Sequence, residues 1–185
     1  MILVLLGTQN NSFHRLLEEI EKNVENGNIV EEVVIQAGYT KFDPKTTKQS
    51  IKIFSTISKQ ELDKLIEKSN LVISHGGVGS MVTANQKGKK VIAVPRLKEF
   101  SEHVNDHQVG TIEVFAKRGY VMPVKNVGEL EQALKNVKAF NPTIYQKDEE
   151  HNIINIIEKF IQNISENYLI DTIKIFAIII FFYFF

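Results

Sequence analysis

Residues 71–95 read LVISHGGVGSMVTANQKGKKVIAVP. The stretch begins with one short apolar run, 71–73, and ends with another, 91–94, which Pro95 stops. A glycine-rich turn and a segment of helical length separate the two runs. Apolar runs of this length, without alternating polar residues, are typical of strands that are buried on both faces of a parallel sheet. The stretch therefore predicts two parallel strands that are joined by a helix.

The same alternation of strand and helix continues on both sides of this stretch. Further strands are expected at 1–6, 33–35, 51–54 and 120–122. Helices are expected at 13–24, after Ser58 as an N-cap with Glu61 three residues on, after Gly79, and at 104–117, 129–137 and 153–161. Residues 43–50 are expected to form a loop within the domain. The sequence thus predicts an α/β domain with a doubly wound, Rossmann-like parallel sheet, in which ligands bind beyond the carboxyl ends of the strands.

The composition excludes several functions. The chain has 185 residues, with 22 Lys and Arg against 22 Asp and Glu, so its formal net charge is zero. This balance argues against general affinity for nucleic acid, whose phosphates require a basic surface. The sequence has no Cys, which excludes disulfides, thiolate metal ligands and cysteine nucleophiles. We expect one globular domain over 1–164, followed by a hydrophobic tail, 165–185.

A glycine-rich loop follows the expected strand at 71–73. Residues 74–80 read SHGGVGS and lead from that strand into a helix. Glycines let a ligand approach the backbone closely, and the free N–H groups at the start of a helix favour an anion such as a diphosphate. Ser80 adds a hydroxyl donor. No Gly-Lys-Ser/Thr follows, so the loop is not a P-loop. The alternative is a tight strand-to-helix turn that binds nothing.

Gly7-Thr8-Gln9 occupies the corresponding place after the first expected strand. Taken alone, this segment is as consistent with a plain turn as with a ligand-binding loop. Because ligands in such sheets bind at the carboxyl edge, the two loops together would form two backbone-rich rims that face one crevice.

Residues 95–108 read PRLKEFSEHVNDHQ and carry further polar candidates. His103 and His107 are four residues apart and would share one face of the expected helix, as two metal ligands do. The order is not His-Glu-x-x-His and no third ligand is evident nearby, so no metal site is expected. We expect a polar cluster that holds a hydroxyl-rich ligand. The alternative is a solvated helix N-terminus, at which the helix dipole favours Glu102 and Asp106.

These motifs occur in the same order in one known family. They are Gly7-Thr8 after the first strand, the loop 74–80, the strand 88–95 and the Glu-His-x-x-Asp-His-Gln pattern at 102–108. The chain resembles the C-terminal, donor-binding half of family 28 glycosyltransferases of the GT-B fold, over about residues 1–163. Within that group it is most similar to the stand-alone subunits of bacterial exopolysaccharide and capsule synthesis, the PssE/EpsF type.

The resemblance implies a nucleotide-sugar donor, most often a UDP-sugar. The residues that it implies for the nucleotide and diphosphate are Gly7, Thr8, His75, Gly76, Gly77, Gly79, Ser80 and Thr83. Those that it implies for the donor sugar are Glu102, Asp106, His107 and Gln108. Many relatives carry a Glu that binds the ribose hydroxyls at the position of Thr83, so this sequence departs from the family there. No metal or other cofactor is implied, because helix-terminal N–H groups stabilise the leaving diphosphate.

A complete GT-B enzyme has two such domains, and its acceptor site and usual general base lie largely in the other one. The resemblance therefore implies a catalytic subunit that transfers a hexose to a polyprenyl-diphosphate-linked saccharide. It would work with a membrane-anchored acceptor-domain subunit, in the cytoplasm at the inner face of the cell membrane. No catalytic base can be assigned in this chain. The alternatives are a non-catalytic nucleotide-binding subunit that enhances a partner transferase, and an α/β domain that binds another nucleotide such as ADP or NAD.

The tail ends in eleven consecutive apolar residues, 175–185. As a helix they would be about 16 Å long, which is about half of a bilayer core. Counting back to Tyr168 gives about 27 Å but includes Asp171 and Lys174, so a full span is marginal. We expect the tail to attach the chain to a membrane or to a membrane-bound partner. The alternative is a hydrophobic helix that packs on the body or on a partner.

Overall fold

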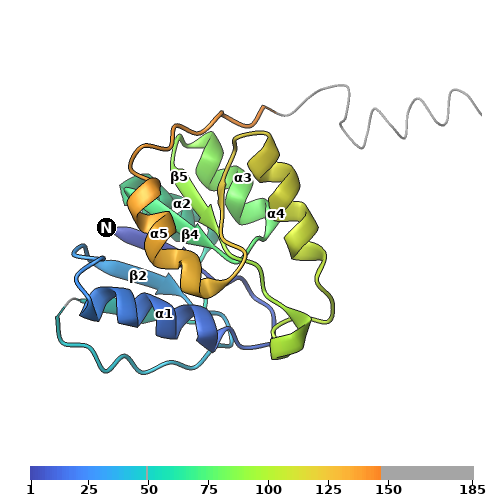
Figure 1. Ribbon diagram of the computed structural model, residues 1–185. Coiled ribbons are helices and arrows are strands. Elements are labelled where there is room, and N and C mark those ends of the chain that lie inside the picture. Colours follow the sequence, from blue (N-terminus) through green and yellow to red (C-terminus); the bar gives the residue numbers. More distant parts are fainter. Residues whose placement is uncertain (49, 147–185) are drawn as a thin grey trace, which may run out of the picture. The chain divides into compact units, whose positions relative to one another are not determined.

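The computed structural model describes residues 1–48 and 50–146, and Met1–Tyr145 forms one compact unit. Six strands in the described residues form one sheet, and every pair is parallel (Figure 1). The strands are β1 (Ile2–Leu5), β2 (Val33–Gln36), β3 (Ile51–Phe54), β4 (Leu71–Ser74), β5 (Lys90–Ala93) and β6 (Met122–Pro123), in the order β3-β2-β1-β4-β5-β6. This architecture confirms the predicted α/β class and the doubly wound, Rossmann-like sheet.

The helices follow the pattern that the sequence predicts, with small shifts of their ends. They are α1 (His14–Glu25), α2 (Lys59–Lys68), α3 (Val78–Gln86), α4 (His107–Lys117) and α5 (Leu130–Asn136), with short 3-10 helices η1 (Lys98–Phe100) and η2 (Val127–Glu129). The N-cap of α2 is confirmed: the Ser58 hydroxyl accepts from the Glu61 N–H at 3.2 Å, and the Glu61 side chain accepts from the Ser58 N–H. Both capping hydrogen bonds satisfy donors that the first helical turn leaves free.

Two apolar cores lie on the two faces of the sheet. Successive side chains of a strand point to opposite faces, so Val4 and Ile73 pack against α1 and α5, whereas Leu3 and Val72 pack against α2, α3 and α4. Figure 1 shows α1 and α5 on one face of the sheet. All four residues of β1, β2 and β4 are buried, as expected for central parallel strands.

The crossover from β2 to β3 contains no helix among its described residues, 37–48 and 50. It is held on α1 instead. The Thr40 hydroxyl accepts from the Phe13 N–H at 3.0 Å, and the Glu21 carboxylate accepts from the N–H groups of Lys45 and Thr46. The described residues of the expected loop, 43–48 and 50, therefore stand in the place of a crossover helix.

Two ends differ from the sequence prediction for identifiable reasons. The helix expected from Val104 begins at His107, because Asp106 accepts from the Lys98 N–H at 2.7 Å and holds the preceding residues in turns. The strand expected at 120–122 begins only at Met122. Tyr120 instead belongs to the end of α4, since its N–H donates to the Phe115 carbonyl in a Schellman-type cap.

The helix expected at 153–161 and the tail at 165–185 lie outside the described residues, so the division of the chain at 164 stays a prediction. Among the residues that the structure describes, no helix is both long enough and apolar enough to cross a membrane.

Candidate functional site

The loops that follow β1 and β4 face each other at the carboxyl edge of the sheet. These strands are neighbours, and the order of the strands along the chain reverses between them, which is the place where doubly wound sheets bind ligands. A pocket of about 320 Å³ opens there, lined by Gly7, Thr8, Gln9, Gln36, Thr56, Ile57, Leu62, His75, Gly77 and Ser80. The structure thus brings together five of the eight residues that were expected to bind the nucleotide and diphosphate.

The other three expected residues lie around this pocket without lining it. Gly76 has a positive φ of +80° and packs on Ile112 beneath the loop, and Gly79 and Thr83 lie within α3. Gly77 occupies the N-cap position of α3, and no described side chain accepts from the first N–H groups of this helix. These donors and the positive end of the helix dipole are therefore available to an anion.

His75 separates the two glycine loops. A Cβ atom on Gly7 would lie 2.7 Å from His75 Nε2, and a Cβ atom on Gly77 would lie 2.5 Å from the same nitrogen. The ring therefore fits between these two residues only because neither carries a side chain. His75 Nδ1 lies 3.0 Å from the Leu5 carbonyl oxygen, which can only accept, so Nδ1 carries the proton and Nε2 is left as an acceptor.

The imidazole of His75 is neutral at pH 7. Burial lowers its pKa to about 4, and the hydrogen bond to Leu5 opposes this only partly. Electrostatic interactions with Arg96 and His103 lower the pKa of His75 further. His75 therefore presents a neutral ring edge to the two loops.

Gln36, at the end of β2, fixes the Gly7 loop, although it was not among the residues expected from the sequence. Its Oε1 accepts from the Gly7 N–H at 3.1 Å, and its Nε2 donates to the Gly7 carbonyl at 2.9 Å and to the Ser55 carbonyl at 3.1 Å. One buried amide thus holds both polar groups of Gly7. A polar residue that closes an apolar strand was the only signal in the sequence.

The four residues expected to bind the donor sugar lie in the loop after β5 and at the start of α4. Asp106 and His107 are exposed, whereas Glu102 and Gln108 are buried. Gln108 Oε1 accepts from the Arg96 N–H at 3.0 Å, and both oxygens of Glu102 accept from Arg15. None of the four lines the pocket, but the neighbouring His103 contacts the lining residue Gln9, with the two Nε2 atoms 3.0 Å apart.

His103 and His107 do not share a helix face, since α4 begins only at His107. Their rings nevertheless meet edge to face with centroids 4.7 Å apart, and Asn105 Oδ1 contacts His107 Nδ1. Among the described residues, no group of three or more His, Cys, Asp or Glu side chains could hold a metal ion.

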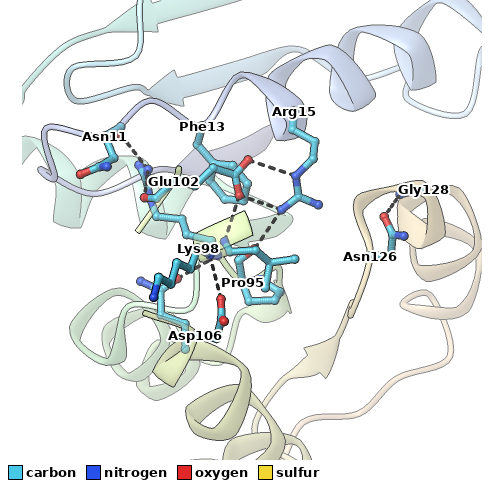
Figure 2. A network of polar contacts seen from close by, with 12 residues as sticks. Asn11, Phe13, Arg15, Pro95, Lys98, Glu102, Asp106, Asn126 and Gly128 are labelled. Atoms are coloured by element: carbon cyan, nitrogen blue, oxygen red, sulfur yellow. Dashed lines mark hydrogen bonds and ion pairs between the residues drawn. The ribbon is translucent and has the colours of Figure 1, made fainter. Parts of the chain in front are cut away.

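A buried ionic network, which was not expected from the sequence either, lies beneath this loop (Figure 2). Arg15 of α1 pairs with Glu102 through Nε at 3.0 Å and through Nη2 at 2.8 Å. Arg96, the residue after Pro95, is fully buried, and burial lowers its pKa to about 10, so it keeps its charge at neutral pH. A cationic residue directly after an apolar strand was the available signal.

Solved glycosyltransferase structures share this fold. The chain superposes on MurG of Acinetobacter baumannii with a TM-score of 0.52 at 15% identity, covering 73% of this chain and 40% of that one. The glycotransferase of kitacinnamycin gives a TM-score of 0.53 at 13% identity, covering 73% and 34%. ALG13, solved by NMR, gives 0.53 at 18% identity, covering 76% and 87%. The chain thus spans well under half of the first two proteins and most of the third.

No curated protein matches the chain. The family described as "Glycosyltransferase family 28 C-terminal domain" matches residues 1–167, which is most of the sequence and includes every candidate residue named above. The chain therefore belongs to the glycosyltransferase family 28 C-terminal domain family.

Proposed function

We propose that this chain is the donor-binding, catalytic subunit of a glycosyltransferase, which moves a hexose from a UDP-sugar to a polyprenyl-diphosphate-linked saccharide. The observation that carries the proposal is the pocket between the Gly7 and His75–Gly77 loops, which opens at the switch point of the sheet beside the uncapped start of α3.

The diphosphate would lie against the first turn of α3. The free N–H groups of this turn and the Ser80 hydroxyl can donate to phosphate oxygens, and the helix dipole favours their negative charge. The described lining of the pocket contains no carboxylate that would repel the anion. During transfer these fixed donors would stabilise the charge that develops on the leaving nucleotide.

The nucleoside would occupy the other side of the pocket, beside Thr56, Ile57 and Leu62. Ile57 and Leu62 offer apolar contact to a base. With Thr83 in place of the family's Glu, the neutral side chains of Thr8 and Gln9 are the proposed partners of the ribose hydroxyls.

The donor sugar would lie toward residues 102–108. Asp106 and His107 are exposed there and offer polar groups to sugar hydroxyls, and Gln108 and Glu102 are buried in the same segment. Gln108→Ala should raise the activation free energy of sugar transfer by the contribution of one hydrogen bond, about 0.5–1.5 kcal/mol, and should change UDP affinity less.

The acceptor would come with a second, membrane-anchored subunit. A GT-B enzyme has two such domains, and the family match over residues 1–167 corresponds to one of them. The apolar tail at 165–185 and the lipid-linked acceptors of the family support attachment at the inner face of the cell membrane. The second candidate is a non-catalytic nucleotide-binding subunit that uses the same pocket to enhance a partner.

Calorimetric titration of the full chain with UDP, ADP and NAD tests the nucleotide site. We expect UDP to bind most tightly, and a folded chain that binds no UDP up to millimolar concentration would overturn the proposal. Gly79→Asp adds a carboxylate beside the start of α3, where a Cβ atom meets nothing within 4 Å. It should weaken UDP binding at least tenfold, whereas the neutral control Gly79→Asn, of the same size, should weaken it much less.

The same pair of variants separates the two candidate functions. In a complex with the acceptor subunit, a catalytic donor-binding chain should lose turnover with Gly79→Asp in parallel with UDP affinity. An enhancer should keep most of the turnover of its partner.

A further inference from the structure

We propose that Arg15, Arg96 and Glu102 form a clamp that positions residues 97–107 for recognition of the donor sugar. This arginine clamp acts through the loop, and its members are positioning residues. The inference rests on the proposed function and assigns to Glu102 a role other than contact with the sugar.

The first half of the clamp joins α1 to the loop. Arg15 holds both carboxylate oxygens of Glu102 in a two-pronged pair, and its side chain is 17% exposed against 4% for Glu102. Glu102 Oε2 also accepts from the Leu97 N–H at 3.0 Å. The Arg15 guanidinium lies over the Phe100 ring, 4.4 Å from its centroid. It also donates weakly to the Pro95 carbonyl at 3.4 Å (Figure 2). Arg15 thus holds the loop at two places, Pro95 and Glu102.

The second half joins the loop to the end of β1. Arg96 donates from Nη2 to the Leu6 carbonyl at 2.8 Å, and from Nη1 to the carbonyls of Asn11 at 2.7 Å and Glu102 at 3.2 Å. Its guanidinium lies 5.0 Å from the centroid of the Phe13 ring. Arg96 therefore holds three separate points of the backbone at fixed distances from one another.

Along the chain, the three residues whose carbonyls accept from Arg96 flank the contact between the loop and a residue that lines the nucleotide pocket. Leu6 and Asn11 flank the segment that carries Gln9, and Glu102 directly precedes His103. Gln9 and His103 meet at 3.0 Å. The clamp thus sets the position of the loop relative to the rim of the pocket.

The turn between the clamp residues is held in an unusual conformation. Ser101 has a φ of +57°, in the left-handed region that non-glycine residues rarely adopt, and its carbonyl accepts from Asn11 Nδ2 at 2.8 Å. Asp106 accepts from the Lys98 N–H at 2.7 Å and closes the loop from the other end. The loop would not keep this shape without the contacts that surround it.

Stability alone does not account for such a network. Burying charges incurs a desolvation penalty that a salt bridge often fails to offset, and apolar side chains of similar volume are frequently as stable. Arg96 also leaves its buried Nε without a partner among the described residues. The two guanidinium groups add geometric specificity, because each donates to several acceptors at once and so fixes their relative positions.

The clamp and the nucleotide pocket have no residue in common. Loss of the Arg15–Glu102 pair, which makes no hydrogen bond to the described residues 6–11, should therefore leave UDP affinity nearly unchanged and weaken the additional recognition of the sugar. This separation distinguishes a positioning role from a general loss of folding.

The test compares Arg15→Met with the matched control Lys22→Met in the full chain. Lys22 is also on α1 and pairs with Glu19 at 3.3 Å, but on the exposed surface. Calorimetry gives the Kd for UDP and for whichever of UDP-glucose and UDP-galactose the unaltered chain binds more tightly. For Arg15→Met we expect the ratio of the UDP-sugar Kd to the UDP Kd to rise at least fivefold, with the UDP Kd changed less than twofold. Arg15→Lys, which keeps the charge, should recover part of this loss, and Lys22→Met should change neither value.

Amide hydrogen exchange provides a second readout that does not depend on a ligand. The N–H groups of Leu97 and Lys98 should exchange at least tenfold faster in Arg15→Met, whereas those of α2 should be unaffected. Unchanged exchange at Leu97 and Lys98, or equal losses of UDP and UDP-sugar affinity, would overturn the clamp. If the unaltered chain bound neither UDP nor the UDP-sugars, the proposed function would fail instead, and with it the role in sugar recognition.

Discussion

Substituting Gly77 by Ala tests how the nucleotide pocket is built. Gly77 has φ −70° and ψ 122°, a conformation open to any residue, so Ala introduces no backbone strain. Its Cβ would lie 2.5 Å from His75 Nε2 and 2.7 Å from His75 Cε1. The ring cannot retreat, because Gly7 confines it on the other side and Nδ1 is bound to the Leu5 carbonyl. We expect an overpacking penalty of about 1–3 kcal/mol.

Gly79 is the matched control. It lies in the same glycine-rich segment but within α3, where an added Cβ meets nothing within 4 Å. Ala is favoured over Gly in a helix by about 1 kcal/mol, so Gly79→Ala should stabilise the chain. The two variants should thus differ by about 2–4 kcal/mol. At about 2–4 °C per kcal/mol for a chain of this size, the Tm values should differ by roughly 4–16 °C.

Thermal unfolding followed by circular dichroism measures both shifts, and a double-mutant cycle locates their cause. In a His75→Ala background the clash disappears, so Gly77→Ala should then destabilise by less than about 1 kcal/mol. Equal Tm values for Gly77→Ala and Gly79→Ala, or the same penalty with and without the His75 ring, would refute the packing argument.

Three further predictions concern the supports of the pocket. His75 has a pKa of about 4 in the fold against 6.5 when free, so the unfolded chain binds more protons between these pH values. The contribution of His75 to the free energy of unfolding should therefore be complete above pH 6.5 and decline by about 3 kcal/mol as the pH falls to 4. Denaturant titrations should show that stability depends less on pH in His75→Gln than in the unaltered chain. Gln36→Leu leaves the polar groups of Gly7 without partners, so it should destabilise by about 2–3 kcal/mol and weaken UDP binding in calorimetry, while an unchanged UDP Kd would show that Gln36 does not hold the rim. Ser58→Ala removes the cap of α2 and should lower stability in urea by about 1 kcal/mol; unchanged stability would show that the two capping hydrogen bonds do not support this helix.

The sequence predicts the fold well where local pattern determines structure. Short apolar runs at 71–73 and 91–94 read as buried parallel strands, and the Ser58 cap is confirmed. The start of α4 and the strand at 120–122 are shifted, because contacts outside the local pattern decide them. The Lys98 N–H donates to Asp106 and holds it in a turn, and the Tyr120 N–H donates to the Phe115 carbonyl in the C-terminal cap of α4.

The candidate site is predictable in part for the same reason. Glycine-rich loops after two apolar strands indicate the two rims, and the switch point of the sheet brings those rims together. The residues that hold the rims are not predictable in this way. Gln36 reaches back 29 residues to Gly7, and Arg96 reaches 90 residues to Leu6. Only the folded chain makes such pairs neighbours.

The central claim is that the pocket between the two glycine rims binds a nucleoside diphosphate. Titration of the isotope-labelled full chain with UDP, followed through its amide NMR signals, tests this most directly. The account predicts saturable shifts that are largest at residues 7–9 and 75–80. Shifts confined to another cavity would contradict it, such as the apolar pocket between α4 and β6 that Val109, Ile112 and Val124 line, and so would the absence of any shift at millimolar UDP.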